Sequence, residues 1–247
     1  MINTNSLGFL GQFYLGLKYN FKKIYQNSNF YEKKISKTFD NYFQYKPSPH
    51  LLSSIIKYQN KKYRIEDFAV ESIWQNKMNT KDYEKLNNFF WFFSLDLKSS
   101  KESTQLVIKN WIKDNSKYNK NSWEFDITSK RIIAWLSNHQ LTYEDSNKDY
   151  RLMFDHMIQK QSNHLLSEIK SSNEFENKLI GCSAIILTGL AYKNEKNYLE
   201  SGLAILKNII KSSIDNQGFT KSRNIKQLVF YLKYLIIIRE WFKESQN

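Results

Sequence analysis

The sequence predicts an all-α fold in which the helices pack as antiparallel hairpins. After about residue 100, apolar side chains recur every three or four residues in six stretches, which is the period of one buried face of a helix. Short polar clusters at 115–122, 144–148 and 193–197 separate several of these stretches, and links of this length join antiparallel helices. A chain of 247 residues that is 41% apolar and 16% aromatic has ample material for a packed core. We therefore expect more than half of the residues to be helical.

The N-terminal part is separated from the rest by Pro47 and Pro49, which break the chain at Y-K-P-S-P-H. We assign residues 1–46 to a helical, aromatic and basic extension and residues 47–247 to a helical body. Within 6–26 the spacing of apolar residues favours an amphipathic helix that docks on the body or on a partner, with lysines near its end where the helix dipole favours cations. Its residues are Leu7, Leu10, Phe13, Leu17, Phe21, Lys18, Lys22 and Lys23.

Each of the six later helices is predicted from its own apolar stripe. The two tryptophans Trp111 and Trp135 lie on such stripes, so we expect both in the core. No internal repeat is detectable, which argues against a regular solenoid. The stripes are Leu106, Val107, Trp111 and Ile112; Ile132, Ile133, Trp135 and Leu136; Met153, Phe154, Met157, Ile158, His164 and Leu165; residues 179–190; Leu203, Ile205, Leu206, Ile209, Ile210 and Ile214; and residues 228–241.

The net charge of +13, from 37 Lys and Arg against 24 Asp and Glu, is large enough to attract an acidic polysaccharide, nucleic acid or an anionic membrane. A composition rich in Lys, Asn, Ile and Tyr also fits compositional drift, without any role for the charge. No glycine-rich nucleotide-binding motif occurs. The single cysteine, Cys182, excludes a disulfide within the chain.

The N-terminus has no positive region ahead of its apolar residues and no small-residue cleavage site, so we expect no signal peptide. A cytoplasmic location is then the default, and a periplasmic one stays open. No run of 18 apolar residues occurs, because Lys233 interrupts the nearest run at 228–238. We therefore expect no membrane span.

Two segments carry the most distinctive motifs. W-E-F-D-I-T-S-K-R-I-I-A-W-L at 123–136 places Trp123, Arg131 and Trp135 at helical spacing, and N-Q-G-F-T-K-S-R-N occupies 216–224. They resemble the W-x-P-x(n)-R-I-x-N-W-L and D-G-G-H-x-x-R-[SN]-P segments of the heparinase II/III family of polysaccharide lyases. The resemblance covers roughly Phe89 to Glu244. It implies an incomplete α/α toroid, the N-terminal part of such a lyase, without the family's C-terminal β-sandwich.

The family's reaction is β-elimination at a uronic acid, in which Tyr or His removes a proton while Asn or His neutralises the neighbouring carboxylate. Asn177 stands at the family's Asn, but Lys178 replaces a His and Thr220 replaces the His of the later turn. The family's catalytic Tyr-His is missing from 225–227. The resemblance therefore implies glycan binding without complete catalysis, and the catalytic residues stay unknown. The expected substrate-binding residues are Arg131, Asn177, Lys178 and Arg223.

Structural roles compete with these assignments. Asn177 suits the N-cap of a buried helix, and Arg223 suits a turn that it locks to a neighbouring helix end. Gly218 suits a turn that needs positive φ, with Asn224 capping the next helix. The block F-F-W-F-F at 89–93 suits a core, although Trp91 could stack on a sugar.

His156, His164 and Glu168 share one predicted helix face, but no further ligand completes a metal site. We expect no metal and no cofactor. The expected partners are an acidic polysaccharide or envelope glycan and a separate β-sandwich half. The alternative function is a non-catalytic helical module that binds nucleic acid or another polyanion, and a third is a scaffold whose N-terminal helix docks on a protein.

Overall fold

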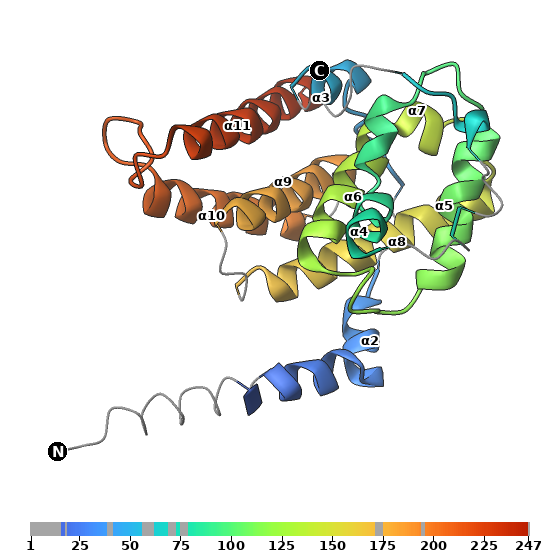
Figure 1. The fold of residues 1–247 in the computed structure, drawn as a ribbon, viewed down its shortest axis with the longest axis horizontal. Helices are drawn as coiled ribbons and strands as arrows, with labels where there is room; N and C mark the ends of the chain where they lie inside the picture. Colours follow the sequence, from blue (N-terminus) through green and yellow to red (C-terminus); the bar gives the residue numbers. More distant parts are fainter. Residues whose placement is uncertain are drawn as a thin grey trace.

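The computed structural model describes residues 16–17, 19–38, 42–55, 62–68, 73–74, 79–170, 175–193 and 196–246. Across these residues the fold is all-α, and helices account for well over half of them, as predicted (Figure 1). The α-helices are α2 (Asn29–Ile35), α3 (Pro49–Ile55), α4 (Thr80–Asn87), α5 (Lys101–Asn115), α6 (Phe125–Ser137), α7 (His139–Thr142), α8 (Lys148–Glu168), α9 (Phe175–Ala191), α10 (Lys196–Ser213) and α11 (Ile225–Ser245). Two 3₁₀ segments, η1 (Ile65–Asp67) and η2 (Phe90–Ser94), lie before α5. Further helical turns cover residues 19–26.

Polar side chains cap the N-terminal ends of several of these helices. Ser100, Asn147 and Asn224 each accept a hydrogen bond from a backbone N–H in the first turn of α5, α8 and α11, which satisfies donors that the helix itself leaves unpaired. The predicted cap at Asn224 is thus confirmed. Among the described residues no helix has both the length and the apolar character to cross a membrane, as expected.

Helix α9 lies at the centre of the helical layer and packs against α6, α8, α10 and α11 (Figure 1). Helices α9 and α10 form an antiparallel hairpin, because Gly189 lies against Leu199 and Gly202 lies against Ile186. Because glycine has no side chain, the two backbones approach each other closely at both positions. Antiparallel hairpin packing is therefore present at α9–α10, and the closure of the helices into a toroid remains a proposal.

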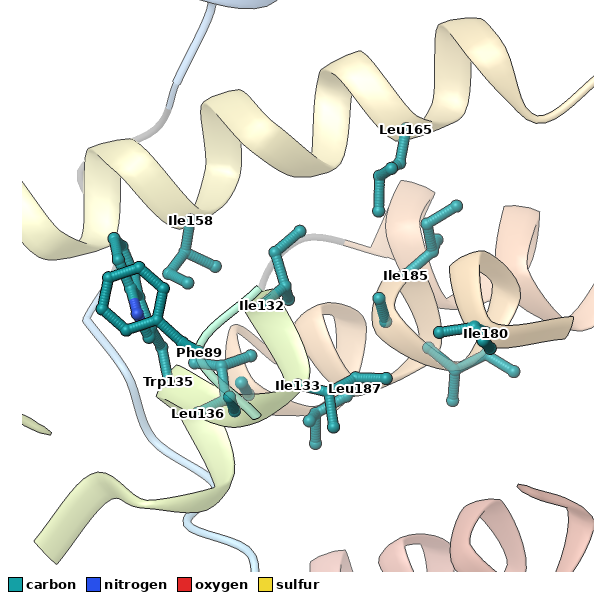
Figure 2. Packing of buried hydrophobic residues seen from close by; sticks show 14 of the residues in the cluster. Phe89, Ile132, Ile133, Trp135, Leu136, Ile158, Leu165, Ile180, Ile185 and Leu187 are labelled. Atoms are coloured by element: carbon teal, nitrogen blue, oxygen red, sulfur yellow. The ribbon is translucent and has the colours of Figure 1, made fainter. Parts of the chain in front are cut away.

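The core joins α6, α8 and α9, with Ile133 and Leu136 of α6, Ile158 of α8 and Leu187 of α9 among its side chains (Figure 2). Trp111 and Trp135 are both fully buried, which confirms the prediction for these residues. Their rings meet edge to face at 5.5 Å, a favoured aromatic geometry.

The aromatic block at 89–93 also belongs to the core. Four of its five phenylalanine and tryptophan side chains are buried, and the partly exposed Trp91 donates a hydrogen bond from Nε1 to the Leu86 carbonyl at 3.2 Å. Phe89 adopts the left-handed region at φ 57°, where a bulky side chain is strained. Its ring packs edge to face on Trp111 and Trp135, so the core holds this conformation in place.

Arg131 of α6 is fully buried among these aromatic rings. Its Nε donates to Gln161 Oε1 at 2.8 Å, and its Nη1 donates to the carbonyl oxygens of Asn87 at 2.9 Å and Ser122 at 2.8 Å. Nη2 donates to Thr128 at 3.2 Å, and the guanidinium lies 4.0 Å from the centre of the Trp111 ring. Burial lowers the pKa of Arg131.

The placement of Arg131 corrects its assignment as a substrate-binding residue. Its hydrogen-bonding groups point at acceptors inside the protein and its side chain has no exposed surface, so it is not accessible to a polysaccharide. Arg131 instead ties α6 to α8, to the end of α4 and to the loop before α6.

The N-terminal segments are attached to the body by buried aromatic residues. Tyr31 of α2 is buried against α8, and Phe43 and Tyr45 are buried ahead of Pro47. The Gln44 N–H donates to the Ala191 carbonyl at 2.8 Å. Residues 42–46 therefore contribute to the packing of the body, although the prolines mark a break in the sequence.

Replacing Arg131 should destabilise the protein strongly. Arg131→Met keeps much of the side-chain volume but leaves the acceptors of Asn87, Ser122 and Gln161 buried without donors, so we expect a loss of about 3 to 5 kcal/mol in the free energy of unfolding. Urea denaturation of the variant and of the exposed control Arg239→Met measures the difference. A loss below about 1 kcal/mol for Arg131→Met would contradict this role.

Replacing Gly189 should disrupt the α9–α10 hairpin. A Cβ at this position would lie 2.5 Å from the Leu199 backbone nitrogen and 2.7 Å from its Cα, so Gly189→Ala has to push the helices apart, at a cost on the order of 1 to 3 kcal/mol. Thermal denaturation followed by circular dichroism tests this expectation. Gly16→Ala serves as control, because a Cβ there meets nothing within 4 Å. An unchanged melting temperature for Gly189→Ala would show that the hairpin is packed differently.

Candidate functional site

A cleft of about 810 Å³ lies between the helical turns 19–26 and the helical body. Its volume falls in the range of ligand-binding pockets in proteins. Side chains of six segments line it: Tyr19, Lys22, Lys23, Gln26 and Asn27; Thr80, Tyr83 and Glu84; Tyr118, Lys120, Asn121, Trp123 and Glu124; Phe125, Asp126 and Ile127; His164 and Glu168; and Asn177.

The body side of the cleft is formed where three helices begin. Thr80 is the first residue of α4, Phe125 the first of α6, and Asn177 lies in the first turn of α9. Unpaired N–H groups and the positive end of the helix dipole are found at such ends. These helix ends favour negative substituents of a ligand, whereas the carboxylates of Glu84 and Glu124, which line the same cleft, oppose them.

Two of the carboxylates at the cleft are paired with lysines. Glu168 at the end of α8 forms an ion pair with Lys22, and Asp126 pairs with Lys130 at 2.5 Å, four residues along α6. These pairs neutralise part of the negative charge in the cleft. Lys23 and Lys120 are exposed and line the cleft, so both are placed to meet a carboxylate or sulfate of a ligand.

The tyrosines near the cleft have different electrostatic environments. A hydrogen bond and the charge of Lys120 lower the pKa of the exposed Tyr19 phenol. Burial raises the pKa of Tyr118 to about 12, and the Tyr118 hydroxyl donates to Gln26 Oε1 at 3.0 Å. Tyr118 thus fixes the helical turns 19–26 on the loop, while Tyr19 faces solvent and is open to a ligand.

His164 has a structural position at the base of the cleft. Its Nε2 donates to the Trp123 carbonyl at 2.9 Å, which leaves Nδ1 to accept from the Tyr31 hydroxyl at 2.7 Å. Burial lowers its pKa to about 3, so the ring is neutral near pH 7. His156 is exposed on the same helix, and no group of three or more metal-ligating side chains occurs among the described residues.

The four residues predicted to bind substrate do not converge on one surface. Asn177 lines the cleft, whereas Lys178 lies with its Nζ 5.8 Å from the Phe175 ring and is not part of the lining. Asn177 is the third residue of α9, so it is not the N-cap that was considered as its alternative role. Arg131 is in the core, as described above.

Arg223 locks the turn between α10 and α11. Its Nη2 lies 2.9 Å from an Asp215 oxygen, and the other oxygen of Asp215 accepts backbone N–H groups of Gln217 and Phe219. Gly218 has φ 85°, the positive value predicted from the sequence. The hydrogen bonds from Phe219 and Gln217 and the charge of Arg223 lower the pKa of Asp215. Arg223 therefore locks the turn, the structural role that was the alternative to substrate binding. Its side chain nevertheless remains largely exposed.

Most residues of the cleft were missed by the sequence analysis. Lys120 and Asn121 belong to the polar cluster 115–122, which was interpreted only as a connection between helices. Their place at the cleft follows from a contact in the fold, the hydrogen bond between the Trp123 carbonyl and His164, and not from a sequence motif. Lys23 was assigned to the end of an amphipathic helix, without a prediction that it faces a ligand site.

A second titratable cluster lies inside the body, around Asp155 of α8. The Asp155 carboxylate is buried and accepts hydrogen bonds from the hydroxyls of Tyr143 at 2.9 Å and Tyr192 at 2.7 Å. Burial raises the pKa of Asp155 to about 7, partly offset by these two hydrogen bonds and by the charge of Arg151. Phe43 packs its ring 5.2 Å from that of Tyr143, so the cluster also holds the segment ahead of Pro47.

Asp155 should make the stability of the protein depend on pH. Its folded pKa of about 7 lies above the unfolded value near 3.8. The stabilising contribution of Asp155 to the free energy of unfolding is therefore fully present below pH 4 and is lost as the pH rises through 7. The free energy of unfolding of Asp155→Asn, relative to the parent, should therefore improve between pH 4 and pH 8. Urea denaturation across this range measures the difference, with Asp149→Asn as an exposed control on the same helix. A difference independent of pH would contradict the raised pKa.

Comparison of the chain with protein-family models, with curated proteins and with solved structures found no match. The resemblance to heparinase II/III lyases therefore rests on the sequence motifs alone.

Proposed function

We propose that the chain is a glycan-binding helical domain, related to the toroid part of heparinase II/III lyases, and that the cleft holds the glycan. An acidic polysaccharide or an envelope glycan is the substrate class. The observation that carries the proposal is the cleft itself, which combines Asn177 with amide, hydroxyl and ammonium groups and with aromatic rings. Such a mixture hydrogen-bonds to sugar hydroxyls while ring faces pack against the apolar faces of a sugar.

The acidic character of the ligand is supported by the distribution of charge. Lys22 and Lys130 are engaged with Glu168 and Asp126, which leaves Lys23 and Lys120 on the solvent side of the cleft. The starts of α4, α6 and α9 add positive potential on the body side. A uronate or sulfate group between these two sides would be met by Lys23 and Lys120 on one side and by the helix N-termini on the other, next to the carboxylates of Glu84 and Glu124, which also line the cleft.

The proposal assigns binding, and not complete catalysis, to the cleft. His164 uses both ring nitrogens in internal hydrogen bonds, so it is not positioned as a general base. Arg131 is buried away from the ligand. A separate β-sandwich half, expected from the resemblance, would supply the missing catalytic groups.

The cleft lysines should decide the affinity for an acidic glycan. We expect Lys23→Gln/Lys120→Gln to weaken the binding of polygalacturonate at least about tenfold at about 0.15 M salt, because each lysine supplies a charge-assisted hydrogen bond. Isothermal titration calorimetry measures the dissociation constants. Lys211→Gln/Lys233→Gln, on the exposed sides of α10 and α11, has the same net charge and should change the affinity less than twofold.

Asn177→Ala separates recognition from charge, since it leaves the net charge unchanged and should still weaken binding. Equal losses for the cleft and control lysine variants would indicate attraction to any polyanion and would favour the nucleic-acid alternative. Unchanged affinity in all cleft variants would remove the cleft from consideration.

A further inference from the structure

The helical turns 19–26 direct their polar side toward the protein and their apolar side toward solvent. On the protein side, Lys22 pairs with Glu168 and Gln26 accepts from the Tyr118 hydroxyl, and Lys23 lines the cleft. A helix docked on a globular domain ordinarily buries its apolar side. The orientation here is the reverse, so a large apolar surface is exposed.

This surface is formed by side chains three or four residues apart. Phe21 is 69% exposed, Ile24 is 68% exposed and Leu17 is 41% exposed, and their spacing places them on one side of the helix. The surface continues through Tyr25 to Phe30 of α2, whose rings lie 6.2 Å apart and which are also exposed. We refer to Leu17, Phe21, Ile24, Tyr25 and Phe30 as the N-terminal apolar strip.

Positive charge follows the N-terminal apolar strip along the chain. Residues 16–38 contain six lysines and one glutamate, and that glutamate, Glu32, pairs with Lys160 of α8. Lys33, Lys34 and Lys37 follow the strip directly and are exposed. Aromatic and aliphatic side chains next to a cluster of lysines are typical of segments that lie in the interface of an anionic membrane.

We propose that the N-terminal apolar strip inserts into the headgroup region of an anionic lipid surface, with Lys33, Lys34 and Lys37 contacting lipid phosphates. The helical turns would lie in the plane of the membrane surface, without crossing it. Tyr25 and Phe30 suit the interfacial depth, where aromatic rings are enriched. The lysines gain from the negative surface potential of the lipid.

A second copy of the chain fits this surface less well. Two-fold pairing of the strip would bring Lys33, Lys34 and Lys37 of both copies close together, and like charges at an interface oppose association. The exposed strip on α11 offers a contrast. It consists of Ile225, Val229, Leu232 and Ile236, without aromatic rings, so we assign the lipid contact to the N-terminal apolar strip alone.

Sedimentation of the full chain with vesicles tests the proposal. The probes are vesicles of phosphatidylcholine with about one quarter phosphatidylglycerol and vesicles of phosphatidylcholine alone, at about 0.1 M salt. We expect at least about tenfold tighter binding to the anionic vesicles, weakening steeply as salt rises. Phe21→Ser/Ile24→Ser should reduce this binding at least about tenfold through lost apolar contact, while Leu232→Ser/Ile236→Ser should stay within twofold of the parent.

The charge contribution is tested separately. Lys33→Gln/Lys34→Gln/Lys37→Gln should weaken binding to anionic vesicles at least about tenfold, and Lys211→Gln/Lys226→Gln/Lys233→Gln, with the same net charge, should not. All these side chains are exposed, so circular dichroism should show parent-like folding. The proposal does not depend on glycan binding, because Lys23 and Lys120 are unchanged in every variant.

Three results would overturn the proposal. One is equal binding to both kinds of vesicle, and another is an equal loss for the α11 variant and the strip variant. The third is a dimer in size-exclusion chromatography that Phe21→Ser/Ile24→Ser abolishes, without vesicle binding, which would assign the strip to a second copy.

Discussion

The buried guanidinium of Arg131 is the interaction on which the rest of the structure depends. A charge removed from water is costly unless its donors are satisfied, and here the partners are neutral oxygens of Asn87, Ser122, Gln161 and Thr128 together with the face of Trp111. These partners come from α4, α5, α6, α8 and the loop before α6. One side chain therefore sets the positions of α4, α5, α8 and the preceding loop relative to α6.

The shape of the cleft depends on this arrangement. The loop 116–124, which carries Lys120 and Asn121, is held from inside the protein at two neighbouring carbonyls. Ser122 accepts from Arg131 and Trp123 accepts from His164. Because the loop is anchored at its base, a ligand in the cleft would meet a backbone that is already ordered, which lowers the entropic cost of binding.

The sequence predicted the helices well because their apolar period is a local property. Trp111 and Trp135 were correctly assigned to the core, and the turn at Gly218 with its cap at Asn224 follows from backbone chemistry that acts over a few residues. The role of Arg131 was not predictable in this way. Its spacing to Trp135 places it on the buried stripe, yet residue type alone favours a ligand contact, and only the acceptors of distant segments decide between the two. The cleft was missed for a similar reason, since its lining comes from six segments between Tyr19 and Asn177.

The helical turns 19–26 have one side on the cleft and the other in solvent, so both sides belong to the same short helical segment. Whatever draws the outer side away from the protein also moves Lys22, Lys23 and Gln26, and with them the outer wall of the cleft. If a ligand on one side displaced these turns, the affinity on the other side would change by a coupling free energy that is equal in both directions. A ligand bound in the cleft would then change the affinity of the N-terminal apolar strip for a lipid surface, and the lipid surface would change the affinity for the ligand by the same factor.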